Sequence, residues 1–166
     1  KAHFPLEFYC ELLNNSLNNT DKIFVILNEM YLLDLKIIPP DINHSDYKFI
    51  LNEDKIIYGL AALKGVGEES MKELVIERNK RGKFKSLSDF NDRLSRSVLN
   101  KRQIEKLILS NSLNSLNTNT SKLFANVENI IQKKSGATLF NDLSDSHFFT
   151  KKDYKILDPI KAEFET

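Results

Sequence analysis

The stretch that decides the fold is Leu63-Lys64-Gly65-Val66-Gly67, which lies between two apolar segments. Two glycines around one apolar residue favour a tight turn, because glycine tolerates positive φ angles that other residues avoid. Such a turn lets two short helices pack back to back and leaves backbone N–H groups pointing outward. Since N–H groups that converge near a helix N-terminus favour an anion, the turn suits a phosphate oxygen.

This turn and its flanks resemble the helix–hairpin–helix motif of DNA-binding proteins. The first arm covers residues 58–62, and the second covers residues 68–81 with apolar side chains at helical spacing. The alternative is an ordinary helical hairpin whose turn contains glycine. The downstream sequence favours the DNA-binding motif.

The composition is ordinary for a globular chain of 166 residues with a net charge of +1. The single cysteine, Cys10, cannot form an internal disulfide, which is typical of a cytosolic protein. No apolar run approaches the length that crosses a bilayer, so we expect no membrane partner. Because the chain opens on Lys1 rather than methionine, we expect a fragment of a longer protein.

The charge is distributed unevenly along the chain. Residues 60–110 contain twelve Lys and Arg against seven Asp and Glu, a local surplus of five cations. A basic middle around the glycine turn fits a surface that faces phosphates. A solvated helical face of mixed charge is the alternative.

Periodicity predicts a mainly α-helical fold, a tandem helix–hairpin–helix with flanking helices and one short β-hairpin. The β-hairpin is expected over residues 47–58, and the helices and the first helix–hairpin–helix are expected over residues 4–17, 21–34, 60–80, 89–94, 101–109 and 121–134. We expect N-caps at Thr20 or Asp21, at Ser88 and at Asn100. Tyr31 is expected on the buried face of the second helix.

Further short motifs occur in a fixed order along residues 1–116. They are Lys1-Ala2-His3-Phe4-Pro5 with Glu7-Phe8 and Leu12-Leu13, Ile38-Pro39-Pro40-Asp41-Ile42-Asn43 with Ser45, residues 58–67, Glu77-Arg78, Gly82, Phe84, Ser86-Leu87, Asp89-Phe90, and Asn100-Lys101-Arg102 with Glu105 and Leu107-Ile108. In this order they resemble the family of bacterial DNA polymerase III alpha subunits, the C-family replicative polymerases.

The resemblance implies a division of the chain. Residues 1–45 would end the fingers region, and residues 46–116 would form the tandem helix–hairpin–helix region that grips duplex DNA. Residues 117–134 would form a helix. Residues 135–166 would be a linker leading to an oligonucleotide-binding domain that is absent from this chain.

The resemblance also implies an activity for the parent protein, DNA-directed DNA synthesis by nucleotidyl transfer with Mg²⁺ held by carboxylates. In this family those aspartates lie upstream of the present segment, and no comparable cluster stands here. We therefore expect no catalytic residue, metal site or cofactor in this segment. The resemblance further implies a bacterial cytoplasmic protein that is associated with the nucleoid. This protein would bind other subunits of the polymerase III holoenzyme.

We predict nonspecific binding of duplex DNA through backbone phosphates. The N–H groups near Gly65, Val66 and Gly67 would donate to phosphates, with Lys64 beside them and Lys72 one turn into the second helix. Contacts of this kind position a protein on DNA without reading its bases. Val66 itself is expected to pin the turn between the helices rather than to touch DNA.

A second, degenerate hairpin is expected before the helix at residues 101–109. Asn100, Lys101 and Arg102 would contact phosphate through side chains, because paired glycines are absent there. A helix start with solvated basic residues is the alternative.

Leu139-Phe140 stands where the family has a short motif that binds the ring-shaped sliding clamp. Gly136 replaces the glutamine normal for that motif, and a hydrophobic pair docking the linker onto its own domain is the alternative. Two other functions compete with DNA gripping. One is a helical module that docks the sliding clamp with little DNA affinity. The other is a stand-alone repair-type enzyme, which the absence of a carboxylate cluster disfavours.

Overall fold

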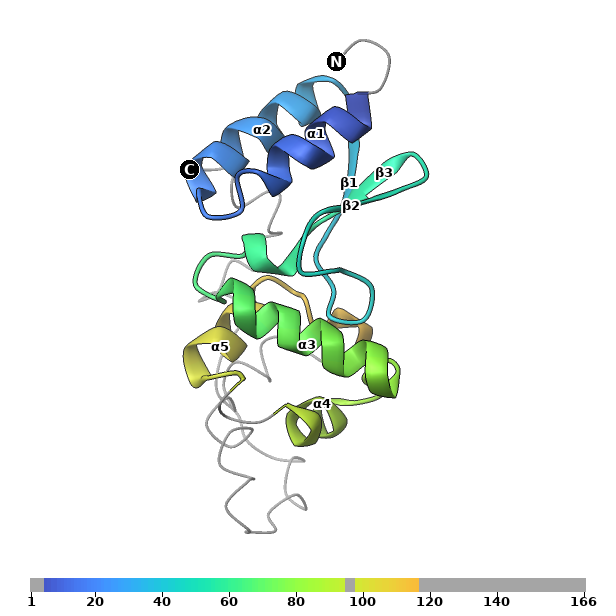
Figure 1. Ribbon diagram of the computed structural model, residues 1–166, viewed down its shortest axis with the longest axis vertical. Coiled ribbons are helices and arrows are strands. Elements are labelled where there is room, and N and C mark those ends of the chain that lie inside the picture. The colour runs from blue at the N-terminus through green and yellow to red at the C-terminus, as the bar shows by residue number, and fades with distance from the viewer. Residues whose placement is uncertain (1–4, 95–97, 117–166) are drawn as a thin grey trace, which may run out of the picture.

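The computed structural model describes residues 5–94 and 98–116. Two helices, α1 (Pro5–Asn14) and α2 (Thr20–Leu32), lie side by side at one end of the molecule (Figure 1). Proline begins α1, where its missing N–H leaves no helical hydrogen bond unmade. Asn19 caps α2 by accepting from Lys22 N–H over 3.0 Å, so the cap lies one residue before the expected position.

The buried face of α2 differs from expectation at Tyr31. Ile23, Leu27 and Met30 are buried as predicted, and Ile26 joins them, whereas Tyr31 is 70% exposed. At 3.6 residues per turn, Tyr31 lies about a quarter-turn from the centre of this face. The expectation for Tyr31 was wrong for that reason.

A small sheet follows, with strands β1 (Lys36–Ile38), β2 (Ile50–Asn52) and β3 (Lys55–Ile57) in the order β1-β3-β2. The antiparallel β2–β3 pair is the predicted hairpin, shortened at both ends. Strand β1 was not predicted, and it pairs with β3 in parallel. The two prolines that follow β1 favour its extended backbone, and β3 supplies the partner.

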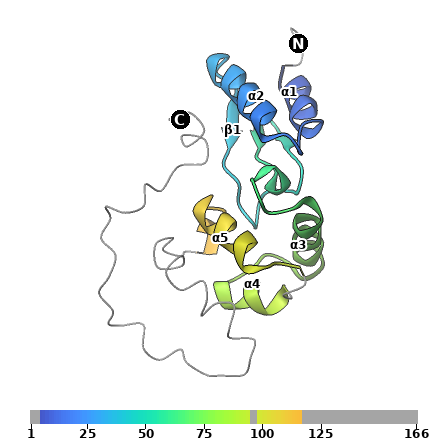
Figure 2. The same ribbon diagram turned by 90° about the vertical axis from the view of Figure 1, so that its left-hand side faces the viewer.

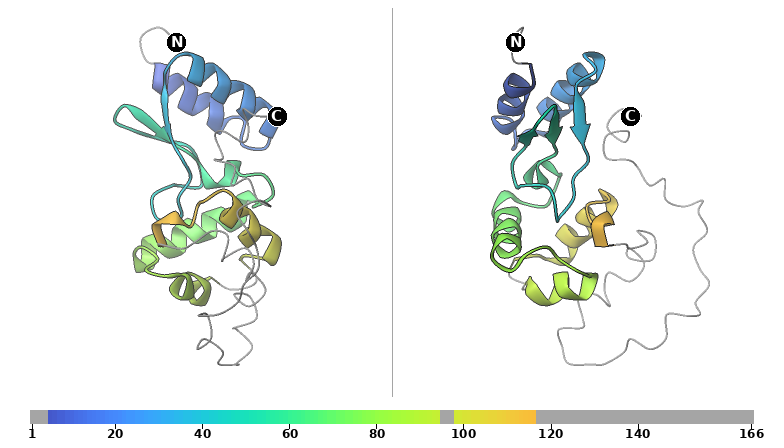
Figure 3. Two further views of the ribbon diagram at one scale, coloured as in Figure 1. Left: turned by 180° about the vertical axis from the view of Figure 1, so that it is seen from behind. Right: turned by 90° about the vertical axis from the view of Figure 1, so that its right-hand side faces the viewer.

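The remaining elements form the other end of the molecule, with the sheet between the two ends (Figure 3). They are the 3₁₀ turn η1 (Leu60–Ala62), α3 (Glu68–Arg81), α4 (Leu87–Arg93), α5 (Lys101–Leu109) and η2 (Asn114–Leu116). Figure 2 shows α3 and α5 on either side of this end, with α4 beneath them. The described part of the chain is thus mainly helical with one small sheet, as predicted.

The first arm of the glycine hairpin is a single 3₁₀ turn, η1, rather than a helix. Gly59 precedes it in extended conformation, and a Cβ at Gly59 would lie 2.5 Å from the carbonyl carbon of Lys48. This close backbone approach fixes the chain just before the turn. Leu63 leaves η1 with a ψ angle of 127°, so helical geometry ends after three residues.

The caps of the last two helices give one correction and one confirmation. Ser86, not Ser88, caps α4 by accepting from Asp89 N–H over 3.1 Å. Asn100 caps α5 as predicted, and the side chains that α5 buries are the expected Ile104, Leu107 and Ile108.

One hydrophobic cluster runs through both ends of the molecule. Its largest fully buried members are Tyr9, Leu13, Ile23, Met30, Ile42, Phe49, Ile56, Leu60, Met71, Leu74, Phe90 and Leu107. Polar contacts cross the predicted boundary at residue 45, because Ile42 N–H donates to Ser112 O over 2.9 Å. The division into regions at residues 45, 116 and 134 stays a prediction, since residues 117–166 lie outside the described ranges.

Candidate nucleic-acid interface

The glycine hairpin has the backbone that its sequence predicts. Gly65 and Gly67 have φ angles of 88° and 78°, and both are exposed together with Lys64. Within the described residues, the N–H groups of Gly65 and Gly67 donate to no protein acceptor. Gly67 also stands at the N-cap of α3, so both donors lie at the positive end of that helix.

Val66 is buried, unlike the two exposed glycines beside it. Its side chain is fully buried, and its N–H faces Leu63 O at 3.4 Å. The residue therefore anchors the turn in the core. This burial agrees with the expectation that Val66 pins the turn, and a contact between its N–H and phosphate stays a prediction.

Gln103 joins the glycine hairpin to α5. Its Nε2 donates to Val66 O and, over 2.9 Å, to Ser70 Oγ. Its Oε1 accepts from Asn100 N–H, completing a capping box at the start of α5. Sequence reasoning missed Gln103, although the Asn-x-x-Gln spacing of the capping box was available as a signal.

Lys106 is the second functional candidate that sequence reasoning missed. A Cβ built on Gly65 would lie 3.8 Å from both Cγ and Cε of Lys106, so this side chain passes over the first glycine. Lys106 is half-buried and makes no ion pair with another described residue. A lysine side chain from α5 therefore lies beside Gly65.

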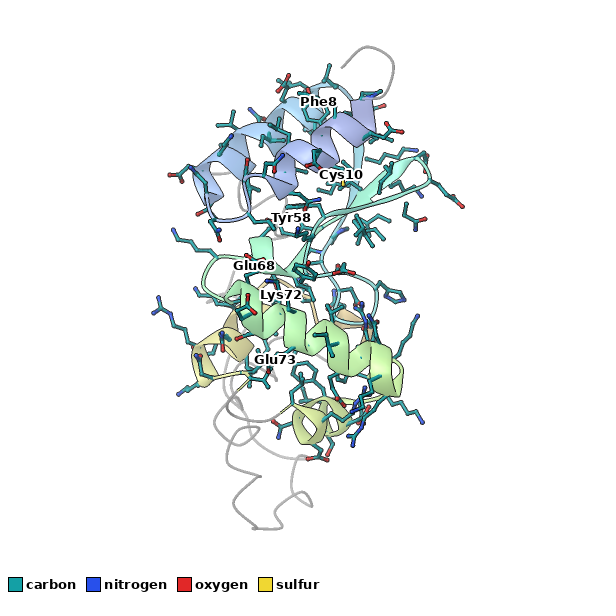
Figure 4. All side chains as sticks on the ribbon, in the orientation of Figure 1. Phe8, Cys10, Tyr58, Glu68, Lys72 and Glu73 are labelled. Carbon is teal, nitrogen blue, oxygen red and sulfur yellow. The ribbon has the colours of Figure 1, made fainter. Side chains whose placement is uncertain are left out.

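Lys72 lies between two carboxylates rather than open to a ligand. Its Nζ is 3.1 Å from Glu68 Oε1 and 2.7 Å from Glu69 Oε1, as the pair Glu68 and Lys72 in Figure 4 illustrates. The ammonium also lies 5.5 Å from the ring centroid of Tyr47. The hydrogen bonds that Lys72 donates to Glu69 and then to Glu68 raise the pKa of Lys72 above its usual value. The structure thus gives Lys72 the role of neutralising the acidic first turn of α3.

The second predicted hairpin precedes α5. Leu99 is buried, as Val66 is in the first hairpin, and the Asn100 side chain is occupied by accepting from Gln103 N–H over 3.0 Å. Lys101 lies 4.0 Å from Glu105. Arg102 is exposed, and it forms no ion pair with the described residues. Of the three residues predicted here, Arg102 offers the most available charge.

The other candidates for chemistry are a cysteine and the acidic side chains. Within residues 5–94 and 98–116, no group of three or more His, Cys, Asp or Glu is arranged to hold a metal ion. Cys10 is buried with its thiol directed at Phe49 O, and this burial raises the pKa of the thiol.

Within residues 5–94 and 98–116, no helix combines the length and apolar character needed to cross a membrane. Leu139 and Phe140 lie outside the described residues, so clamp binding stays a prediction.

The sequence of this chain is similar to those of known proteins. A model of the helix-hairpin-helix motif family matches residues 34–123. DNA polymerase III subunit alpha of Buchnera aphidicola subsp. Schizaphis graminum is 35% identical over 173 aligned positions, which cover 98% of this chain and 15% of the relative.

The same subunit of Vibrio cholerae is 37% identical over 81% of this chain and 12% of the relative. That of Escherichia coli K12 is 40% identical over 74% of this chain and 11% of the relative. The chain spans 11% to 15% of the length of these three relatives. The resemblance to DNA polymerase III alpha subunits is confirmed, and the chain belongs to the helix-hairpin-helix family.

Proposed function

We propose that this chain is a duplex-gripping segment of a DNA polymerase III alpha subunit, which holds DNA through its phosphates without reading sequence. The observation that carries the proposal is the pair of exposed N–H groups at Gly65 and Gly67, which have no acceptor in the described protein. An exposed turn of this kind can donate to an anion without breaking an internal hydrogen bond.

The cations around the turn support a phosphate as the anion. Lys106 passes over Gly65, and Lys64 is exposed in the turn itself. A hydrogen bond to a charged group contributes about 1.5–3 kcal/mol. Two amide donors with one or two lysines therefore suffice for weak binding that is sensitive to salt.

The acidic first turn of α3 opposes this binding and helps to set its strength. Glu68 and Glu69 place two carboxylates beside the amides, and like charges repel a phosphate. Lys72 pairs with both of them, which reduces the repulsion. Lys72 thereby supports DNA binding through the carboxylates rather than by direct contact.

The second hairpin would add side-chain contacts. Arg102 is exposed at the first turn of α5, and Lys101 precedes it beside Glu105. The Gln103 hydrogen bonds hold this turn against the first hairpin, so both sets of donors share one part of the surface. Two anchored turns fix the orientation of a duplex better than one.

The activity and the remaining partners belong to the longer polypeptide. We propose DNA synthesis with Mg²⁺ for the whole polymerase, with its chemistry supplied by regions other than the described residues. Contacts with other holoenzyme subunits, and with the sliding clamp through Leu139 and Phe140, are proposed on the resemblance alone. A pull-down that compares the natural linker peptide with its double alanine variant tests the clamp contact.

The experiment for DNA binding measures the affinity of the chain for a labelled duplex at several salt concentrations. The variant K64Q/R102Q/K106Q removes three charges at the hairpins. We expect it to lower the affinity and to reduce the slope of log affinity against log salt by up to about 0.9 for each phosphate that the variant no longer neutralises.

The matched control is K22Q/K36Q/K55Q, which removes three charges on α2, β1 and β3. It is expected to keep most of the affinity and slope, because it lowers the net charge by the same three units but removes no charge at the hairpins. Equal losses in the two variants would contradict the hairpin site. A chain that binds the clamp but shows no salt-dependent DNA binding would instead favour the clamp-docking module.

A further inference from the structure

A second basic surface lies at the opposite end of α3 from the glycine hairpin. Residues 78–85 include five Lys and Arg and no acidic residue. Arg78 turns inward, where it donates to the carbonyl oxygens of Ile42 and Ser45. Four exposed cations remain, of which Arg81 pairs with Glu77, while Lys80, Lys83 and Lys85 are lysines. We refer to residues 80–85, the last two residues of α3 and the segment after them, as the basic loop.

The start of the basic loop is held by Arg93 of α4. The Arg93 guanidinium, only 8% exposed, donates to Gly82 O over 2.9 Å and to Lys83 O over 3.4 Å. It also donates to Glu77 O over 3.0 Å, and its Nε lies 3.2 Å from Glu77 Oε1. One buried side chain thus fixes two consecutive carbonyls of the loop to the end of α3.

The second half of the loop is fixed by two other side chains. The Asn43 amide accepts from Phe84 N–H over 2.8 Å and donates to Phe84 O over 2.9 Å. Asp89 accepts from Lys85 N–H over 2.9 Å. The buried Phe84 ring packs edge-on against Phe90, with centroids 5.1 Å apart. The backbone of the loop is therefore immobilised while its lysine side chains face solvent.

The acidic groups near the loop are already engaged. Glu77 pairs with Arg81 and Arg93, and Asp89 pairs with Arg93. Lys83 Nζ donates to His44 Nε2 over 2.9 Å, and His44 Nδ1 in turn lies 2.9 Å from Asp41 Oδ1, but Lys83 itself makes no ion pair with a carboxylate of the described residues. Neither Lys80 nor Lys85 forms an ion pair with the part of the chain that the structure describes. The loop thus carries unbalanced positive charge.

Cations at the end of a helix also complement the helix dipole, which explains Lys80 and Arg81 in the last turn of α3. It does not explain Lys83 and Lys85, which follow the C-cap Gly82. A fixed backbone that presents lysines loses little further conformational freedom when it binds a ligand. This preorganisation points to an extended anion.

We propose that the basic loop binds a second stretch of nucleic-acid phosphodiester backbone, separate from the phosphates at the glycine hairpin. The 14 residues of α3 span about 20 Å at 1.5 Å per residue, which is about six nucleotide steps along one strand. The inference goes beyond the proposed hairpin contacts and shares with them only the class of ligand.

The test measures affinity for a labelled DNA duplex against salt for K80Q/K83Q/K85Q, beside the hairpin variant and the K22Q/K36Q/K55Q control. We expect the loop variant to lose several-fold more affinity at low salt than the control. Its salt slope should fall by up to about 0.9 for each phosphate that the loop no longer neutralises. The variant K80R/K83R/K85R keeps the charge and should bind nearly as the unaltered chain does.

The outcomes separate this inference from the proposed function. A loop variant that binds like the control, while the hairpin variant loses affinity, overturns the basic loop alone. A hairpin variant that binds like the control, while the loop variant loses affinity, supports the loop and contradicts the hairpin. An unaltered chain that binds no duplex at low salt overturns both. Circular dichroism of each variant checks that its helices are retained.

Discussion

The side-chain amide of Gln103 makes three hydrogen bonds, and together they join the start of α5 to the glycine hairpin. It accepts from Asn100 N–H at the start of its own helix, and it donates to Val66 O and Ser70 Oγ across to the glycine hairpin. Both the oxygen and the nitrogen of this amide are thus engaged by protein partners on the two hairpins. The relative placement of the two turns therefore depends strongly on this one residue.

Replacing Gln103 by alanine tests that dependence. Q103A removes the capping-box partner and leaves the Val66 carbonyl without its side-chain donor, so we expect the free energy of unfolding to fall by about 1–3 kcal/mol. Urea denaturation of the chain measures the loss. The neighbouring exposed Arg102 provides the control, because R102A should change stability by less than about 0.5 kcal/mol. Equal effects at the two positions would contradict the role given to Gln103.

At the scale of elements, α4 and the loop before it are coupled through Asp89. This carboxylate accepts from Lys85 N–H and lies 3.3 Å from Arg93 Nη1. The hydrogen bond from the Lys85 backbone, followed by the contact with Arg93, lowers the pKa of Asp89 below its usual range. A lowered folded-state pKa means that the ionised carboxylate stabilises the fold.

The pH dependence of stability follows from the lowered pKa of Asp89 in the folded state. The contribution of Asp89 is fully present above the unfolded pKa of about 3.9, and it is lost as pH falls through the lower folded pKa. D89A should therefore be less stable than the unaltered chain near neutral pH, with a difference that narrows below about pH 4. Denaturation curves across this range measure it. A difference in unfolding free energy that stays constant with pH would contradict the interpretation.

Across the whole molecule, the features that the sequence predicts are those that depend on residues close together in the chain. The glycine hairpin and the Asn100 cap were predicted because each is encoded within a few residues. The pairing of Lys72 with Glu68 and Glu69 was also local, at spacings of four and three, and the i,i+4 rule could have found it. The features that were predicted, and the unpredicted Lys72 pairs that a local rule could have found, all depend on neighbours in the sequence.

Features that depend on distant neighbours were missed. Strand β1 needs β3 beside it, and Gln103 meets Val66 across 37 positions of sequence. Lys106 approaches Gly65 only because α5 packs next to the hairpin. No helical or strand period encodes these contacts, since tertiary packing creates them.

The proposed grip on DNA depends first on the Gly65 and Gly67 amides, which would donate to DNA phosphates. The most direct measurement is a ¹H–¹⁵N NMR titration of the chain with a short duplex at low salt. We predict that the amide protons of Gly65 and Gly67 move strongly downfield as hydrogen bonds to phosphate form, and that added salt reverses the shift. The proposed contact would be contradicted if the resonances of both glycines stayed in place while the duplex bound elsewhere. It would also be contradicted if the duplex did not bind.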